Sequence, residues 1–239
     1  LVKTSTMNQA IFNTEDWNKL CHLGGIMALI VVAIIPVQIF IFGLWPPPKE
    51  VLGFFELLHK NWFLGLLSLD LLYLVNNILL AFVYLALFAA LRNTKAYAMF
   101  IALVLGFIGI AVYYSSTAAF EMLSLSKQYF ATPDAQLQQQ LLAAGQAIHE
   151  GYKGTAFDVY YILNGIALVI IGFTMLNDPA KTFSKRTAIW GLISAFLMTI
   201  PSTFGIVGLI FSIASLVPWI VFSILISKQL FAISKNNQQ

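Results

Sequence analysis

Long apolar segments alternate with short polar ones along most of this chain. From about residue 23 to residue 231, six segments are rich in Leu, Ile, Val, Phe and Ala. A transmembrane helix needs about 20 predominantly apolar residues. The pattern therefore predicts six membrane-spanning helices, at about 23–45, 62–91, 96–125, 154–176, 187–204 and 206–227.

Helix-breaking residues set several of these boundaries. The first predicted span ends at Pro46-Pro47-Pro48, because proline cannot continue a helix. Residues 187–226 carry no charged side chain, and at roughly 1.5 Å per residue one helix of that length would be about 60 Å long, twice a bilayer core. We expect this segment to fold back near Pro201, Gly205 and Gly208, as a hairpin of two spans.

Two further segments are amphipathic rather than uniformly apolar. Residues 49–59 are too short to cross a membrane and are typical of an interfacial helix. Residues 132–149 form a polar insertion in which Thr132 is the expected N-cap, Pro133 suits the first helical position and Asp134 favours the positive end of the helix dipole. Its apolar stripe, which we expect to face the bundle or the membrane, consists of Leu137, Leu141, Leu142 and Ile148.

The composition indicates the same class of protein. Of the 239 residues, 59% are hydrophobic and 10% are charged, and the mean hydropathy is +0.83. About a quarter of the residues of a soluble domain are charged. A soluble domain, a disordered chain, a disulfide scaffold (Cys21 is the single cysteine) and a nucleic-acid binder are therefore excluded, and the predicted fold is an all-α integral membrane bundle of six helices.

The distribution of lysine and arginine predicts the orientation. If both termini share one side, that side has nine basic residues: Lys3, Lys19, Arg92, Lys95, Lys181, Lys185, Arg186, Lys228 and Lys235. The other side has four, namely Lys49, Lys60, Lys127 and Lys153. We therefore expect a cytoplasmic N-terminal segment (1–22), a membrane domain (23–231), a cytoplasmic tail (232–239) and both amphipathic helices on the outer face. The first residues lack the basic region of a cleavable signal peptide, and Met7 is a candidate start.

Three acids fall inside the predicted spans, where an ionisable residue indicates function by default. They are Asp70, Glu121 and Asp158, all in the outer half. Each acid has polar neighbours on its own helical face. The spacing i, i+3, i+7 relates Asp70, Tyr73 and Asn77, and it also relates Tyr114, Thr117 and Glu121. Asp158 and Tyr161 begin the same pattern. We expect these faces to form one polar pocket, open to the outer leaflet and covered by the amphipathic helices.

A structural interpretation of the same residues also stands. The Tyr and Asn side chains can serve as interhelical hydrogen bonds, and Glu121 and Asp158 can extend to the interface. Asp70 is too deep and too short to do so easily. No Lys or Arg lies within the spans to neutralise it, so it is protonated, hydrogen-bonded or paired with a cation from outside.

No catalytic or metal signature accompanies these residues. The chain has no G-x-S-x-G, Gly-rich phosphate loop, HExxH or CxxC motif, and we expect no cofactor. A three-histidine zinc site is excluded because we expect His22 on the opposite side of the membrane from His59 and His149. His59, His149 and Glu150 could form a metal site if the two amphipathic helices meet.

The chain also resembles a known family. The segments "YYSSTAAFEMLSLSKQY", "LLAAGQA", "GTAFDVYYILNGIAL", "FSKRTAIWGLISA" and "SLVPW", between about Leu72 and Phe231, are similar to an uncharacterised family of bacterial six-helix membrane proteins that contain a domain of unknown function. The resemblance implies a bacterial inner-membrane protein and no particular activity.

Three functions are compatible with this pattern. The first is binding or transport of a small amphiphile or cation in the outer-leaflet pocket, among membrane lipids and without nucleic acid. The second is an intramembrane enzyme that modifies a lipid with Asp70 or Glu121 as general acid or base, which the missing nucleophile and metal ligands disfavour. The third is an accessory subunit that packs against a membrane-protein partner through Gly106 and Gly109.

Overall fold

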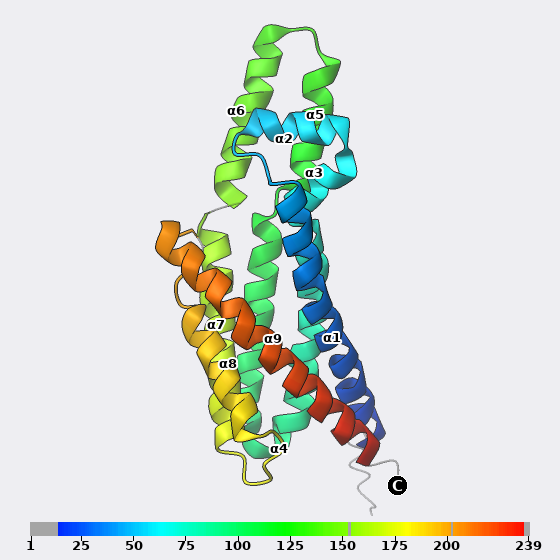
Figure 1. Cartoon of the computed structure of the whole chain (residues 1–239), viewed down its shortest axis with the longest axis vertical. Coiled ribbons are helices and arrows are strands. Elements are labelled where there is room, and N and C mark those ends of the chain that lie inside the picture. The colour runs from blue at the N-terminus through cyan, green and yellow to red at the C-terminus, as the bar shows by residue number, and fades with distance from the viewer. Residues whose placement is uncertain (1–13, 153, 202, 237–239) are drawn as a thin grey trace, which may run out of the picture.

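The computed structural model of the chain describes residues 14–152, 154–201 and 203–236, and every regular element among them is a helix. The bundle consists of α1 (Thr14–Leu44), α4 (Leu71–Ser116), α7 (Thr155–Leu176), α8 (Lys185–Leu197) and α9 (Gly205–Asn236). The end of the molecule beyond the bundle, which we call the outer end, consists of α2 (Val51–Lys60), α3 (Trp62–Ser68), α5 (Ala119–Ala131) and α6 (Ala135–Tyr152). Figure 1 shows α5 and α6 extending beyond the bundle as a hairpin, opposite the end where α1 begins and α9 finishes.

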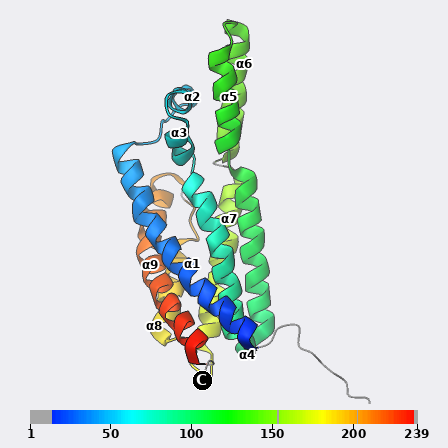
Figure 2. The same ribbon diagram turned by 90° about the vertical axis from the view of Figure 1, so that its right-hand side faces the viewer.

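The helix α4 doubles back on itself at Lys95, whose backbone is not helical (φ −148°, ψ 76°). The Tyr114 hydroxyl donates a hydrogen bond of 2.8 Å to the carbonyl oxygen of Leu74, and Gly106 lies against the ring of Tyr84. Residues equally far from Lys95 thus lie side by side, so the two halves are antiparallel (Figure 2). The turn coincides with the polar run Arg92-Asn93-Thr94-Lys95, which belongs in water.

Small residues allow the bundle helices to approach closely. A Cβ added at Gly24 of α1 would lie 2.1 Å from the Cβ of Ala86 in α4, and one at Gly25 would lie 3.0 Å from the Phe231 ring of α9. The Ser227 hydroxyl of α9 also donates a hydrogen bond of 2.8 Å to the Gly25 carbonyl oxygen. Close backbone contact through glycine and hydrogen bonds from serine are typical of helices that associate in lipid.

The outside of the bundle is apolar. Large side chains that would be buried in a soluble protein are exposed, among them Phe40 (65%), Phe196 (66%), Ile206 (69%) and Val217 (61%). Within the part of the chain that the structure describes, four helical stretches are long and apolar enough to cross a membrane: Thr14–Leu44, Leu71–Ala131, Ala135–Leu176 and Gly205–Lys235. The chain is therefore a helical membrane protein.

The outer helices have a hydrophobic core of their own. Buried side chains of α2, α3 and α5 form it, and residues of α6 pack around it: Val51, Phe54, Phe55, Leu58, Leu66, Leu69, Ala118, Ala119 and Met122 inside, with Leu142, Ile148 and Tyr152 against them. The Ser126 hydroxyl donates a hydrogen bond of 2.7 Å to the Phe55 carbonyl oxygen and joins α5 to α2. The helix expected at 49–59 thus packs on protein along its apolar face.

The second and third of the expected helices, at 62–91 and 96–125, are shorter than predicted. The second is interrupted at Asp70, which takes the left-handed conformation (φ 62°) between α3 and α4. Aspartate tolerates this conformation better than most residues. The third ends at Ser116, and the backbone of Thr117 is extended. The helix ends here because Ser115, Ser116 and Thr117 each donate a side-chain hydrogen bond to the backbone carbonyl oxygen three residues earlier.

Other boundaries differ by smaller amounts. The first helix begins at Thr14 rather than at 23, with Glu15 and Asp16 in its first turn and a 2.6 Å ion pair between Lys19 and Glu15. The last helix continues to Asn236, and the break before it covers residues 198–204. The expected N-cap of the helix at 132–149 was wrong: Asp134, not Thr132, accepts hydrogen bonds from the first backbone amides of α6. The candidate start at Met7 lies outside the described residues.

Candidate functional site

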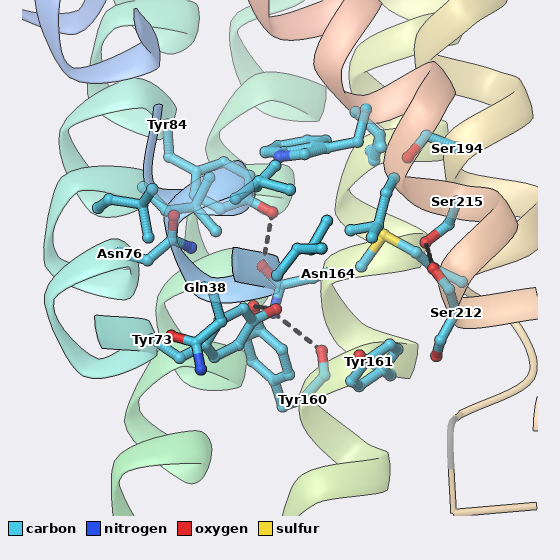
Figure 3. Close-up of a pocket in the computed structure, with 18 residues that line it drawn as sticks. Gln38, Tyr73, Asn76, Tyr84, Tyr160, Tyr161, Asn164, Ser194, Ser212 and Ser215 are labelled. Atoms are coloured by element: carbon cyan, nitrogen blue, oxygen red, sulfur yellow. Dashed lines mark hydrogen bonds between the residues drawn. The ribbon is translucent and has the colours of Figure 1, made fainter. Parts of the chain in front are cut away.

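A cavity of about 170 Å³ lies inside the bundle, between α1, α4, α7, α8 and α9. We call it the inner cavity. Its walls are mostly aliphatic and aromatic, with polar groups on several sides (Figure 3). The residues that line it are Ile34, Ile35, Gln38, Ile39, Tyr73, Asn76, Leu80, Tyr84, Tyr160, Tyr161, Asn164, Leu168, Ser194, Met198, Ser212, Ser215, Leu216 and Trp219.

A hydrogen-bonded network joins α4 to α7 along one wall of the inner cavity. Tyr84 donates a hydrogen bond of 2.7 Å to Oδ1 of Asn164, and Nδ2 of Asn164 donates one of 2.9 Å to the carbonyl oxygen of Tyr160. The hydroxyls of Tyr73 and Tyr160 lie 3.2 Å apart (Figure 3). Gly109 makes room for this network, since a Cβ there would lie 2.5 Å from Nδ2 of Asn164. This wall is therefore internally satisfied and fixed in position.

Several polar atoms elsewhere in the inner cavity have no hydrogen-bond partner in the described part of the chain. Both side-chain polar atoms of Gln38 and the hydroxyls of Ser194 and Ser212 are buried, and none of them has a hydrogen-bond partner among the described residues. These side chains come from α1, α8 and α9. An unsatisfied polar group in the membrane interior costs several kcal/mol, and these atoms therefore have hydrogen-bonding capacity that the described residues leave unused.

A second space, of about 480 Å³, lies beyond the inner cavity toward α2 and α6. We call it the outer vestibule. It shares Gln38, Tyr73 and Tyr161 with the inner cavity, so the two spaces lie against each other. Its other lining residues are Phe42, Pro47, Pro48, Phe54, Ser68, Asp70, His149, Tyr152, Phe157 and Thr203.

The vestibule has a carboxylate held by the outer hairpin. The Tyr152 hydroxyl at the end of α6 donates a hydrogen bond to Oδ2 of Asp70, at the start of α4. The Tyr152 ring lies 6.3 Å from the ring of Phe157 and 6.2 Å from the ring of His149. Among the described residues that line the vestibule, Asp70 is the only acid, and none is Lys or Arg. The vestibule thus presents one carboxyl group with aromatic walls.

The structure brings together some of the predicted site residues and separates others. Asp70, Tyr73 and Tyr161 line the vestibule. Asn77 is fully buried beside them, where its Nδ2 donates a hydrogen bond of 3.0 Å to the carbonyl oxygen of Tyr73. Tyr114 lines neither space, and its hydroxyl bonds to the backbone of α4.

The three acids do not converge on one chamber. Asp158 accepts a hydrogen bond from the Thr203 hydroxyl, and Thr203, not Asp158, lines the vestibule. Glu121 lies in α5, outside the bundle helices, and its side chain is exposed. Thr117 bonds to the Tyr114 carbonyl oxygen and lines neither space. Asp70 alone supplies a carboxylate to the cavities.

Several lining residues were missing from the predicted site. Gln38 is the only polar side chain in the predicted first span, and this isolation could have identified it. Ser194 and Ser212 are common residues in apolar helices, and no spacing distinguishes them. Tyr152 lies outside the predicted spans, so only the three-dimensional fold brings it to Asp70.

The histidines of the outer helices pack as aromatic rings. His149 is buried, with its ring 5.2 Å from that of Phe54, and His59 stacks on Phe130 at 4.2 Å. Among the described residues, no group of three His, Cys, Asp or Glu side chains could hold a metal ion. Gly106 and Gly109, considered above as a surface for a partner, are buried against Tyr84 and Asn164 of the same chain.

Comparisons with known proteins do not add to this description. No family model matches the chain, and neither a curated protein nor a solved structure was found to be similar to it. The function is therefore argued from the two cavities.

Proposed function

We propose that this chain is a six-span protein of the bacterial inner membrane that belongs to the six-helix family named above. The two halves of α4, together with α1, α7, α8 and α9, form six helical segments of the bundle, and this number supports six crossings. Both ends of the described chain lie at the same end of the molecule, as an even number of crossings requires (Figure 1). The excess of lysine and arginine at that end supports a cytoplasmic location for it, with α5 and α6 outside.

Single-cysteine labelling tests this topology, because Cys21 is the only native cysteine and is buried. In a Cys21→Ser background, Gln140→Cys places a thiol on exposed α6 and Ala180→Cys places one on the exposed turn after α7. A membrane-impermeant maleimide applied to intact cells should label only the first, and both after lysis. Labelling of Ala180→Cys in intact cells, with Gln140→Cys protected, would reverse the proposed orientation.

We propose further that the protein binds a small amphiphile in the inner cavity. The observation that carries this proposal is the set of buried polar atoms on Gln38, Ser194 and Ser212 that have no protein partner. They are surrounded by apolar walls, which suit a molecule with both apolar and hydrogen-bonding parts. At about 170 Å³ the space is close to the roughly 150 Å³ of an engineered cavity that binds benzene, so the bound group is small.

Access from the membrane supports an amphiphile over a water-soluble ligand. Helices α1 and α9 are in contact where Ser227 meets Gly25 and diverge toward the outer end (Figure 1). Ile39 of α1 lines the inner cavity and is 59% exposed on the apolar surface of the bundle. Because Ile39 lies both on the cavity wall and on the apolar surface, we expect a molecule dissolved in the outer leaflet to enter past this side chain.

Fluorescence quenching tests the binding of such a molecule, because Trp219 lines the inner cavity. In a variant that keeps Trp219 as its sole tryptophan, a short-chain bromoalcohol should quench fluorescence saturably. Gln38→Leu and the double variant Ser194→Ala/Ser212→Ala should weaken this binding, since they remove the unpartnered polar atoms.

Ser215→Ala is the matched control. Ser215 lines the same cavity, but its hydroxyl already donates a hydrogen bond of 2.7 Å to the Ser212 carbonyl oxygen. Its loss should leave the quenching curve unchanged. Non-saturable quenching that is identical in all of these proteins would overturn the proposal of an inner binding site.

A further inference from the structure

The outer vestibule combines one carboxylate with several aromatic rings. Asp70 and Tyr73 come from the start of α4, Tyr152 from the end of α6, and Phe157 and Tyr161 from the first turns of α7. The rings of Phe157 and Tyr161 lie 5.1 Å apart, and those of Tyr152 and Phe157 lie 6.3 Å apart. Three helices thus hold these rings around one space.

The carboxylate and the aromatic rings of the outer vestibule together disfavour the binding of an anion or of a metal ion. An anion would meet the Asp70 carboxylate, and the described residues of the vestibule wall include no Lys or Arg to offset it. A metal ion would find no group of three His, Cys, Asp or Glu side chains in the described part of the chain. Aromatic faces attract organic cations instead, and cages of such rings recognise quaternary ammonium groups.

We propose that the outer vestibule binds an alkylammonium group, the cationic end of the amphiphile whose apolar part occupies the inner cavity. The inference rests on the proposed function, which it makes more specific. Gln38, Tyr73 and Tyr161 line both spaces, so a single molecule extends from one to the other past these side chains. The ammonium group lies against the aromatic rings and pairs with Asp70, whose carboxylate accepts a hydrogen bond from Tyr152 at one oxygen.

The test compares three probes with the same eight-carbon chain and different head groups: octyltrimethylammonium, 1-octanol and octyl sulfate. Their affinities for the full chain are measured by titration calorimetry in dodecyl maltoside, against protein-free micelles as the reference. We expect octyltrimethylammonium to bind at least about tenfold more tightly than 1-octanol, and octyl sulfate more weakly than either.

Two variants show whether the preference for octyltrimethylammonium over 1-octanol arises at Asp70. Asp70→Asn removes the charge but suits the left-handed backbone at this position, since asparagine also adopts it. It should lower the affinity for octyltrimethylammonium by about tenfold and leave that for 1-octanol unchanged. Glu121→Gln removes one charge from an exposed side chain of α5 that lines neither space, and it should change neither affinity.

The outcomes separate this inference from the proposed function. If 1-octanol and octyltrimethylammonium bind equally well and Asp70→Asn changes nothing, the ammonium site is wrong while the inner cavity stands. If none of the probes binds, both proposals fail. An equal loss of ammonium binding in Glu121→Gln would mean a general surface charge effect and would also overturn the ammonium site.

A second variant covers the case in which Asp70→Asn does not fold. Phe157→Leu keeps the charge and an apolar side chain but removes one ring from the vestibule wall. It should reduce octyltrimethylammonium binding severalfold and leave 1-octanol binding unchanged. An unchanged affinity for the ammonium probe would contradict an aromatic site.

Discussion

Tyr84 of α4 donates a hydrogen bond of 2.7 Å to the side-chain oxygen of Asn164 in α7, a residue 80 positions later in the chain. Both side chains are buried and both line the inner cavity. The amide of Asn164 is held a second time by the carbonyl oxygen of Tyr160. This pair fixes the distance between two helices at the cavity wall.

Removal of this hydrogen bond should destabilise the protein. Tyr84→Phe leaves the oxygen of Asn164 without its partner in the membrane interior, and hydrogen bonds between helices in lipid contribute about 0.5 to 2 kcal/mol. Unfolding in sodium dodecyl sulfate, followed by circular dichroism, measures the loss. Tyr97→Phe is the control, since Tyr97 is 71% exposed and its change should be near zero. Equal stabilities of the two variants would show that the pair contributes nothing.

A methyl group at Gly106 should disturb the same region from the other side. In Gly106→Ala the new Cβ would lie 2.7 Å from two ring carbons of Tyr84, and the ring cannot move freely because Asn164 holds its hydroxyl. We expect a loss of about 1 to 3 kcal/mol in the free energy of unfolding.

Gly43→Ala provides the matched comparison. Gly43 is also helical, but a Cβ there meets nothing within 4 Å, so alanine should be neutral or stabilising by up to about 1 kcal/mol. Both variants are measured by the same unfolding assay. A result in which Gly106→Ala is as stable as Gly43→Ala would contradict close contact between the two halves of α4.

Asp178 lies in the turn after α7, and its hydrogen bonds should make the free energy of unfolding depend on pH. Burial acts to raise the pKa of Asp178, but hydrogen bonds from Thr182, Thr94 and the Ala180 amide outweigh it and hold the pKa below its ordinary value. An aspartate whose pKa is lowered by folding stabilises the protein above its unfolded pKa, and the contribution is lost as the pH falls through the folded pKa.

Asp178→Asn should therefore be less stable than the native chain by about 1 kcal/mol at neutral pH, because an amide NH2 would face the Thr182 N–H. The difference should shrink as the pH falls below the ordinary range for aspartate. Asp134→Asn is the control, since asparagine is an equally good N-cap for α6. Thermal unfolding across an acidic pH series checks both, and a constant difference at every pH would refute the role of the charge.

The length and apolar content of the segments were sufficient to predict the helical membrane bundle, because both follow directly from the lipid solvent. The end of α1 before Pro46 and the extent of α7 were predicted within one or two residues. The interruption at Asp70 was not, because an aspartate in a left-handed conformation leaves no mark in a hydropathy pattern. The same holds for the end of α4 at Ser116, which depends on local side-chain hydrogen bonds.

The candidate site was harder to predict than the fold. Charge singled out three acids, yet Asp70 alone of them lines a cavity. The break at Thr117 places Glu121 in α5, outside the bundle, and Asp158 accepts a hydrogen bond from Thr203 instead. Among the unpartnered atoms of the described residues, those of Gln38 belong to α1, far in the sequence from Ser194 and Ser212 on the consecutive helices α8 and α9. Their meeting depends on how α1, α8 and α9 cross, and helix crossing is set by packing contacts that a single sequence does not display.

The wall that α9 contributes has a consequence for how the protein is made. Ser212, Ser215 and Trp219 come more than 170 positions after Gln38, so they leave the ribosome well after it. Until α9 inserts, the inner cavity lacks one wall, and lipid or the translocation machinery must cover the side-chain amide of Gln38. A chain truncated before α9 would thus leave that polar group without one wall of the inner cavity, so the insertion of α9 completes the chamber.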